Sequence, residues 1–336
     1  MEAAAAIGER MRERWQRGTC ELALDAAAAA RLLEPIFPGA VVTSAEPIGG
    51  GLANTNIRAV LAGRSEPVRL RLYQQDPPQA RKEAAVSRLI ASRVPVPGFL
   101  HVADSNPITG RPYAIIEWVE GVRLETAFAA MDDAVLTRLG RSLGGTLAAI
   151  HSFGFDKFGF PDSELRVPEA IDLDREGLLT YLEECFVRGR GGARIGADLT
   201  AALMAFAGRE GARLDAWLDR PCLVHSDFNG SNILVRPEQV TAGWNVTAIL
   251  DWENALSGTP AFDFGNLLRP PLGARTGFAD AVSAGYREHG GNLPDSWRRI
   301  AQICDLYNWA EFLNRPDPGE ALIADARRVI EKTISG

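Results

Sequence analysis

The 336-residue sequence has few of the side chains that build disulfide frameworks or metal clusters. Its four cysteines and four histidines are widely separated, and they show no CxxC, HxxxH or other metal-ligand spacing. We therefore expect the cysteines to be reduced and mostly buried.

The sequence also lacks the long hydrophobic runs of targeting and membrane segments. Near the N-terminus the residues 9–14 form a charged run, and no basic region leads into an apolar stretch as in a secretion signal. No apolar run reaches the roughly 20 residues that cross a bilayer. These absences predict a soluble, cytoplasmic protein with no membrane partner.

A third absence is an excess of positive charge. The chain has 36 Lys and Arg against 43 Asp and Glu, a net charge of −7, and its basic residues are scattered. This balance argues against a nucleic-acid partner and favours cationic or neutral ones. The stretch 188–194 has the composition of an RGG segment, but in an acidic chain a solvated loop is the better interpretation. The sequence carries no signal for an oligomeric state.

What the sequence does contain changes in character at about residue 120. Apolar residues make up 46% of the chain, and its length suits about two globular domains. Before this point, alternating patterns and turns predict a small antiparallel sheet with one helix, and after it the periodicity is mainly helical. We therefore expect an α+β fold with two parts, 1–120 and 121–336.

The expected strands of the first part are 41–48, 55–61, 68–73, 100–102 and 113–119, with a helix over 79–92. The expected helices of the second part include 135–150, 173–187, 197–218, 278–289, 295–314 and 319–334. A hairpin of two short strands, 233–235 and 246–250, interrupts this helical part.

The clearest chemical motif lies between residues 224 and 235. His225, Asp227 and Asn232 form H-x-D-x-x-x-x-N ahead of an apolar strand, the spacing of the protein-kinase catalytic loop. In such a loop the Asp orients an acceptor hydroxyl and takes its proton, while the Asn gives an oxygen to a phosphate-bound Mg²⁺. The sequence therefore predicts Asp227 as catalytic and Asn232 as a metal ligand, with His225 bracing the loop.

A second metal carboxylate should follow the next strand. Asp251 does so, at the head of the letters D-W-E after the apolar residues 246–250. Residues 263–265 spell D-F-G, the protein-kinase metal-binding motif, but they stand at the start of a predicted helix. We therefore predict Asp251 as the metal ligand and expect Asp263 to cap that helix or brace the catalytic loop.

These motifs, with G-x-P-x-x-D at residues 258–263, resemble those of the aminoglycoside phosphotransferase and choline kinase family. The resemblance covers most of the chain, from about Ile48 to the C-terminal helices. It implies a two-lobed protein-kinase-like fold with a small antiparallel-sheet N-lobe and a large, mainly helical C-lobe. It also implies an enzyme that uses ATP, or GTP, with Mg²⁺.

The glycines Gly49, Gly50 and Gly51 resemble the family's nucleotide-binding loop. Glycines in such a loop let backbone N–H groups approach phosphates. An ordinary hairpin turn is the alternative interpretation. The segment is not a Walker A loop, because no Gly-Lys-Ser/Thr follows it.

The segment 115–121 resembles the hinge that joins the two lobes. Backbone groups of Glu117 and Val119 would there bind the edge of the adenine. The alternative interpretation is a plain strand that leaves the sheet.

The strand that should carry the family's phosphate-binding lysine has none. In residues 68–73 the apolar side chains alternate with Arg69 and Arg71, which therefore share one face. The resemblance places Arg71 at the lysine position and Glu83 as its partner on the following helix. A guanidinium can hold phosphate and carboxylate together, so Arg71 is expected to replace the lysine, with a purely structural arginine as the alternative.

Together these motifs predict transfer of the γ-phosphoryl group of ATP, or GTP, to a hydroxyl of a small molecule. Acidic and aromatic residues of the second part would suit a cationic acceptor, and an ordinary solvated surface is the alternative for each acidic one. They are Glu183, Glu184, Asp305, Tyr307, Trp309, Glu311, Asp317 and Glu320. The expected acceptor is an aminoglycoside-type or other cationic antibiotic, inactivated by O-phosphorylation. The alternatives are a housekeeping kinase of an amino alcohol, amino acid or sugar, and a non-catalytic nucleotide-binding module.

Overall fold

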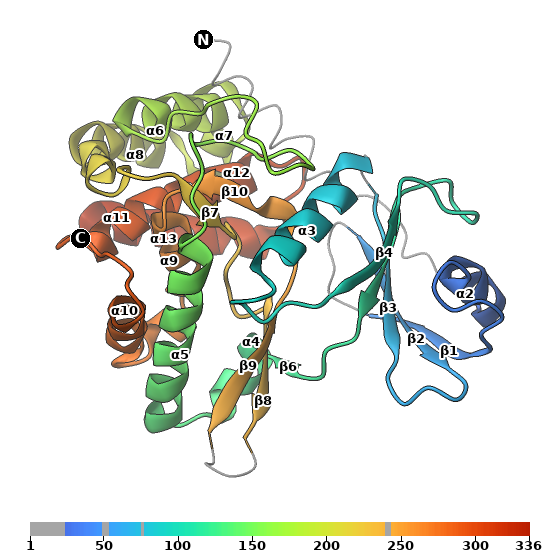
Figure 1. Cartoon of the computed structure of the whole chain (residues 1–336). Helices are drawn as coiled ribbons and strands as arrows, with labels where there is room; N and C mark the ends of the chain where they lie inside the picture. The colour runs from blue at the N-terminus through green and yellow to red at the C-terminus, as the bar shows by residue number, and fades with distance from the viewer. Residues whose placement is uncertain (1–23, 49–53, 75–76, 239–242) are drawn as a thin grey trace.

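The computed structural model describes residues 24–48, 54–74, 77–238 and 243–336, which form two lobes (Figure 1). The N-terminal lobe is built on an antiparallel sheet with the strand order β1-β2-β3-β5-β4. Its strands are β1 (Val42–Pro47), β2 (Thr55–Leu61), β3 (Val68–Leu72), β4 (Phe99–Ala103) and β5 (Tyr113–Glu117). The small antiparallel sheet expected from the alternating pattern is confirmed.

Helices cover both faces of this sheet. α2 (Ala26–Leu33) lies on the outer face, where Leu32 shares an apolar cluster with Ile57 of β2. Asp25 begins this helix by accepting a backbone N–H of its first turn. α3 (Pro77–Ile90) lies on the other face, between the sheet and the C-terminal lobe (Figure 1).

Two long helices, α5 (Asp133–His151) and α10 (Phe278–Glu288), lie side by side in the C-terminal lobe (Figure 1). The apolar stripe over 135–150 predicted α5 correctly. A Cβ at Gly144 would lie 2.1 Å from the backbone oxygen of Val282. Glycine at this position therefore allows the two helices to pack closely.

Two small sheets hold the loops of the C-terminal lobe. One contains β6 (Val122–Arg123), β8 (Ile233–Pro237) and β9 (Trp244–Ile249), and the other pairs β7 (Cys222–Val224) with β10 (Leu256–Gly258). The N–H of Leu250 donates to the carbonyl of Asn232 at 2.8 Å. The loop between β7 and β8 therefore lies beside the segment that follows β9.

Further helices make up the rest of this lobe. They are α4 (Leu124–Ala127), α6 (Arg175–Leu182), α7 (Gly191–Ile195), α8 (Ala197–Glu210), α9 (Ala261–Leu267), α11 (Trp297–Cys304), α12 (Leu306–Asn314) and α13 (Glu320–Ser335). A π-helix (Glu183–Arg188) follows α6, and 3-10 helices cover Phe128–Ala130, Gly211–Trp217, Trp252–Asn254 and Leu272–Ala274.

The prediction of one continuous helix over 295–314 was wrong in part. It is interrupted at Asp305, between α11 and α12. The Asp305 carboxylate pairs with Arg269 and accepts the indole N–H of Trp309 at 2.6 Å. The Asp305 side chain at the interruption thus bonds to Arg269 and Trp309, and the helical periodicity of the sequence does not reveal these contacts.

The prediction of a solvated loop over 188–194 was also wrong in part. The end of this stretch forms the short helix α7, and Arg194 donates to the carbonyls of Leu313, Arg315 and Pro316. Arg194 therefore fixes the end of α12.

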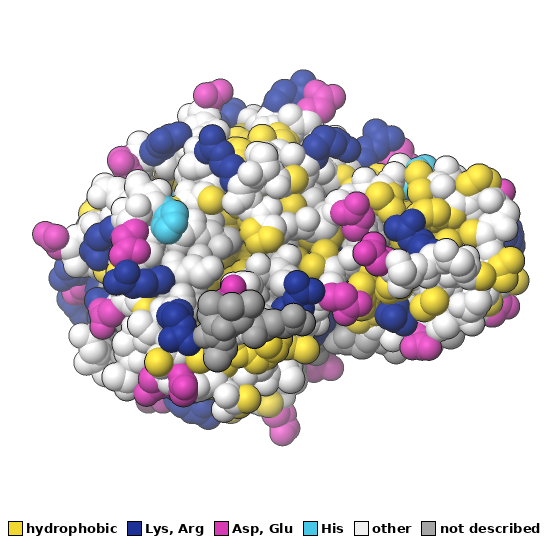
Figure 2. All heavy atoms as spheres, turned by 60° about the horizontal axis from the view of Figure 1, so that its bottom comes forward, with side chains coloured by type: hydrophobic (Ala, Val, Ile, Leu, Met, Phe, Trp, Pro, Cys, Tyr) yellow, Lys and Arg dark blue, Asp and Glu magenta, His cyan; other side chains and the backbone are white. Residues whose placement is uncertain are grey.

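The distribution of charge on the surface and the burial of the cysteines agree with what the composition predicted. Lys and Arg are interspersed with Asp and Glu on the face displayed in Figure 2. Cys185, Cys222 and Cys304 are buried and free, as expected, and Cys20 lies outside the described residues. None of the described helices combines the length and the hydropathy needed to cross a membrane.

Candidate active site

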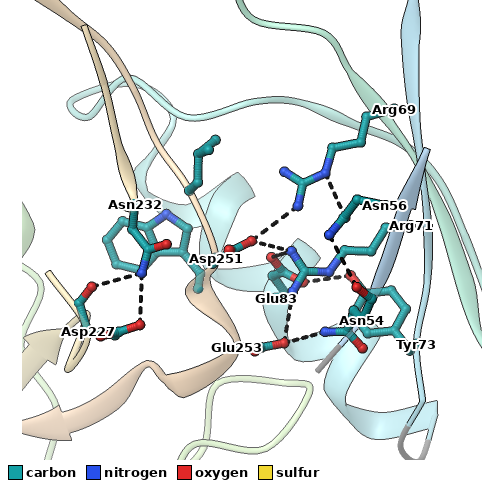
Figure 3. A network of polar contacts seen from close by, with 12 residues as sticks. Asn54, Asn56, Arg69, Arg71, Tyr73, Glu83, Asp227, Asn232, Asp251 and Glu253 are labelled. Carbon is teal, nitrogen blue, oxygen red and sulfur yellow. Dashed lines mark hydrogen bonds and ion pairs between the residues drawn. The ribbon is translucent and has the colours of Figure 1, made fainter. Parts of the chain in front are cut away.

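The loop between β7 and β8 folds around Asp227. The amide nitrogen of Asn232 donates to the Asp227 carboxylate at 2.8 Å and to its backbone carbonyl at 3.0 Å (Figure 3). Asn229 donates to the other carboxylate oxygen at 2.7 Å. Because both bonds use the amide nitrogen of Asn232, its amide oxygen is directed away from Asp227. The structure thus joins the two predicted residues in one hydrogen-bonded loop.

Asp263 braces this loop from α9. Its carboxylate is fully buried and accepts the backbone N–H of His225 at 2.9 Å and that of Ser226 at 2.7 Å. Nε2 of His151, at the end of α5, lies 3.1 Å from the same carboxylate. Nε2 of His225 lies 2.7 Å from the carbonyl oxygen of Leu250. Of the two roles expected for Asp263, the contacts show the second, bracing the loop.

Asp251 follows β9 in an unusual backbone conformation. Its φ of 60° lies in the left-handed region, where residues with a side chain are uncommon. Its carboxylate accepts hydrogen bonds from Arg71 and, at 3.1 Å, from Arg69. The Asp251 side chain is 31% exposed, whereas that of Asp263 is 0% exposed. Of the two candidate carboxylates, Asp251 is therefore the one that a ligand can reach.

Arg71 joins the two lobes (Figure 3). Its side chain is 2% exposed, and its guanidinium contacts Glu83 at 3.2 Å, Glu253 at 2.8 Å and also Asp251. Glu83 lies on α3 of its own lobe, as the sequence predicted. Asp251 and Glu253 belong to the other lobe. The ion pairs of Arg71 therefore hold β3 and α3 against the segment after β9.

Burial and charge shift the pKa values of these carboxyl groups in different directions. Burial alone would raise the pKa of Asp251, but Arg71 and Arg69 outweigh it and hold that pKa below its usual value. Burial raises the pKa of Glu253, although Arg71 opposes the shift. Burial also raises the pKa of Asp227. Asp251 is therefore the most firmly ionised of the three.

A cavity of about 200 Å³ connects this network to the predicted hinge. Residues 117–119 form one wall, where the chain leaves β5. The lining residues are Ile48, Asn56, Arg69, Pro97, Glu117, Trp118, Val119, Gly121, Arg123, Leu234, Leu250 and Asp251. Both predicted hinge residues and the predicted metal carboxylate thus border one cavity, whereas Arg71 does not line it.

The donor atoms near Asp251 suit magnesium. Within the described ranges, no group of three or more His, Cys, Asp or Glu could hold a metal without further ligands. Mg²⁺ takes oxygen ligands and commonly combines one or two carboxylates with substrate phosphates. The Asp251 carboxylate and the Asn232 amide oxygen are donors of this kind, so the residues present fit the ion.

Sequence reasoning missed several residues of the network. Asn54 donates to Glu253 at 2.5 Å across the lobes, and Asn56 accepts from Arg69 at 2.9 Å. Tyr73 donates to Glu83 at 2.6 Å. The available signal was the polar N-x-N pattern at the start of β2. The predicted loop residues Gly49, Gly50 and Gly51 lie outside the described residues.

Two acidic residues expected around the acceptor are buried in ion pairs near Asp227. Asp305 pairs with Arg269, and Glu311 pairs with Arg315 at 2.8 Å. The charge of Arg269 lowers the pKa of Asp227, against the larger effect of burial, and Asp227 in turn helps to raise the pKa of Glu311. This side of the site is therefore balanced in charge rather than strongly acidic.

The other expected acceptor residues have varied surroundings. Tyr307 is buried, with its ring 5.3 Å from that of Tyr181. Glu183 and Glu184 both pair with Arg188, at 2.9 and 2.8 Å. Four of the six acidic groups named from the sequence thus pair with arginines of the same chain, and two of them share Arg188.

A small antiparallel sheet over a helical lobe, with an Asp–Asn loop and a second carboxylate at the junction, defines a two-lobed kinase-like fold. The chain belongs to the phosphotransferase enzyme family, whose model matches residues 44–302. It is therefore a phosphotransferase with an alcohol group as acceptor, and the resemblance found in the sequence is confirmed. No curated protein sequence matches the chain.

Solved structures with the same fold include aminoglycoside phosphotransferases and a protein named as a fructosamine-3-kinase. The GDP and kanamycin complex of aminoglycoside phosphotransferase APH(2″)-IIIa is 18% identical, with a TM-score of 0.69 over 90% of this chain and 97% of that one. A ternary complex of APH(4)-Ia with AMP-PNP and hygromycin B is 18% identical, with a TM-score of 0.65 over 92% and 98%. A protein named as a fructosamine-3-kinase from Thermobifida fusca YX-ER1 is 18% identical, with a TM-score of 0.60 over 92% and 100%. At this identity the likeness concerns the fold.

Proposed function

We propose that this phosphotransferase moves the γ-phosphoryl group of ATP or GTP to a hydroxyl of a small molecule, with Mg²⁺ as cofactor. The observation that carries the proposal is that the Asp227–Asn232 loop is hydrogen-bonded to Leu250, directly before Asp251, and that Asp251 lines a cavity bordered by the predicted hinge segment. Family membership supports the reaction class.

Asp227 is the proposed catalytic residue. Its hydrogen bonds to Asn229 and Asn232 fix the carboxylate, so that it can orient the acceptor hydroxyl and take its proton. The raised pKa caused by burial makes this carboxylate a stronger base than an exposed one.

Asn232 and Asp251 would hold the metal ion, which neutralises phosphate charge when bound. Arg71, fixed by Glu83, is the proposed counterpart of the usual lysine at the nucleotide phosphates. The proposed nucleotide site further includes Gly49, Gly50 and Gly51, which would lie at the phosphates. The backbone groups of Glu117 and Val119 would bind the edge of the nucleobase.

For the acceptor, we propose first an aminoglycoside-type or other cationic antibiotic, supported by the fold shared with aminoglycoside phosphotransferases in complex with kanamycin or hygromycin B. A second candidate is a less cationic metabolite, such as an amino alcohol, amino acid or sugar derivative. The pairing of Asp305 with Arg269 and of Glu311 with Arg315 favours this second class, because few carboxylates stay available for a polycation.

The test is nucleotide consumption measured against a panel of acceptors. Release of ADP or GDP is followed with aminoglycosides, amino alcohols, amino acids and sugars, and each product is examined by mass spectrometry for an added phosphoryl group. The Asp227→Asn variant is the matched control. If no acceptor is phosphorylated while the protein still binds nucleotide, the chain is a nucleotide-binding module and the proposed function fails.

A further inference from the structure

Arg69 occupies a different position from its neighbour on the same face of β3. The Arg69 side chain lines the cavity and is 12% exposed, whereas Arg71 is 2% exposed and enclosed by carboxylates. In the sheet, Arg69 pairs with Ile116, which lies within the predicted hinge segment 115–121. Arg69 is therefore the β3 arginine that a nucleotide in the cavity would meet first.

The guanidinium of Arg69 is fixed at one end and bound to Asp251 at the other (Figure 3). Its Nε donates to Asn56 at 2.9 Å, and its Nη2 donates to Asp251 Oδ1 at 3.1 Å. Within the described residues it makes no other hydrogen bond, so Nη1 has donors to offer. The guanidinium is a rigid planar fork, so rotation of the aliphatic part of the side chain can present its outer donors to a ligand in the cavity.

The contact with Asp251 competes with a metal ion. Oδ1 of Asp251 accepts hydrogen bonds from both Arg69 and Arg71. A divalent cation on this oxygen would lie close to two positive guanidinium groups, and like charges at short range repel. Arg71 also has Glu83 and Glu253 as partners, whereas Asp251 is the only carboxylate that Arg69 contacts among the described residues. Arg69 is therefore the arginine that changes partner at the smaller electrostatic cost.

We propose that Arg69 is a nucleotide-binding residue that weakens cation binding at Asp251 until a nucleoside triphosphate is present. When nucleotide and metal bind together, the guanidinium moves from Asp251 to the phosphate oxygens, which form strong, charge-assisted hydrogen bonds with arginine. The Asp251 carboxylate would then have one guanidinium fewer competing with the metal ion that it would help to hold. This inference rests on the proposed function and adds a coupling between its two ligands.

The first test measures cation binding without nucleotide. Mn²⁺ serves as the probe, followed by electron paramagnetic resonance in wild type, Arg69→Ala and Arg123→Ala. Arg123 is the control because it lines the same cavity, and its carboxylate contact is with Glu125 at 3.7 Å rather than with Asp251. Loss of one charged hydrogen bond corresponds to about a tenfold change in affinity. Arg69→Ala should therefore bind Mn²⁺ about tenfold more tightly, and Arg123→Ala should change by less than about threefold.

The second test measures nucleotide binding by the same variants. With Mg²⁺ present, Arg69→Ala should bind AMP-PNP or GMP-PNP about tenfold more weakly than wild type, because one phosphate contact is lost. The two affinities thus move in opposite directions, which a general loss of structure would not produce. A variant in which both affinities fall, or either is unchanged, overturns the proposal.

A third variant separates this proposal from the proposed function. In Arg69→Ala combined with Asp251→Asn, the tighter Mn²⁺ binding should disappear, and its persistence overturns the proposal. If wild type binds neither nucleotide at any concentration tested, the proposed function itself fails.

Discussion

The carboxylate of Asp263 accepts the backbone N–H of Ser226 at 2.7 Å. Ser226 has a φ of 61°, in the left-handed region that residues with a side chain seldom adopt. The buried carboxylate therefore holds the loop that carries Asp227 in a conformation that the chain would otherwise avoid. This contact explains why a residue that heads the letters D-F-G has a structural role.

The first prediction compares the two candidate carboxylates. Asp263→Asn should lower the free energy of unfolding by about 1–3 kcal/mol, because one of the two backbone N–H groups loses its acceptor and the other keeps only a neutral one. Asp251→Asn should instead abolish activity and raise the Mg²⁺ requirement. Urea unfolding and Mg²⁺ titration of activity check both. A stable Asp263→Asn protein with altered Mg²⁺ dependence would assign the metal to Asp263.

The second prediction concerns Asp227, the proposed catalytic base. Asp227→Asn keeps the size of the side chain and an oxygen that can accept from Asn232, so the protein should fold and bind nucleotide normally. It should lose about 10²–10⁴-fold in kcat, because a neutral amide cannot take the proton of the acceptor hydroxyl. Single-turnover phosphoryl transfer and nucleotide titration measure the two properties separately. Turnover near the wild-type rate contradicts the assignment.

The third prediction is the pH dependence of this base. Burial raises the pKa of Asp227, and Arg269 lowers it by a smaller amount. Since the base acts only when ionised, kcat should fall as the pH drops through a midpoint above the ordinary Asp value of 3.8. Arg269→Ala should move this midpoint to higher pH, and Arg269→Lys should move it less. A midpoint that shifts to lower pH in Arg269→Ala would contradict the electrostatic account.

The sequence revealed the parts of the site that lie within one short segment. Asp227 and Asn232 are five residues apart, so their contact depends on a single loop whose residue types and spacing are chemically specific. The strand over 68–72 was predicted from its alternating pattern, which also placed Arg69 and Arg71 on one face. Local geometry was enough for these inferences.

The contacts across the lobes could not be predicted in this way. Arg71 and Glu253 are separated by 182 positions, and their contact at 2.8 Å depends on how the two lobes pack against each other. Helical periodicity likewise does not predict a glycine at position 144, because the space for a side chain there is limited by Val282 on another helix. Side chains whose partners are distant in sequence were therefore the ones that sequence reasoning missed.

The fourth prediction concerns Gly121 on the cavity wall. A Cβ at this position would lie 2.7 Å from Oγ1 of Thr247 and 3.2 Å from the backbone oxygen of Val235, so Gly121→Ala must displace the chain after the hinge. It should weaken nucleotide binding and lower stability. Gly208→Ala on α8 is the control, because its Cβ meets nothing within 4 Å, and it should stabilise the protein by about 0.5–1 kcal/mol. If wild type and Gly121→Ala bind nucleotide with equal affinity, the chain at Gly121 is not part of the nucleotide-binding site.

The fifth prediction tests Arg71. Arg71→Ala removes the positive partner of Glu83, Asp251 and Glu253 and leaves buried carboxylates uncompensated. The free energy of unfolding should fall by about 3–5 kcal/mol, and nucleotide affinity should fall with it.

Arg71→Lys separates charge from geometry at the same position. An ammonium is a single centre and cannot match the fork that meets carboxylates of both lobes, so it should recover only part of the stability and of the nucleotide affinity. Urea unfolding and nucleotide titration of the two variants give these quantities. If Arg71→Ala binds nucleotide as tightly as wild type, Arg71 has a structural role only. The phosphate contacts would then belong to Arg69 and the glycine segment, because Arg69 is the β3 arginine that lines the cavity.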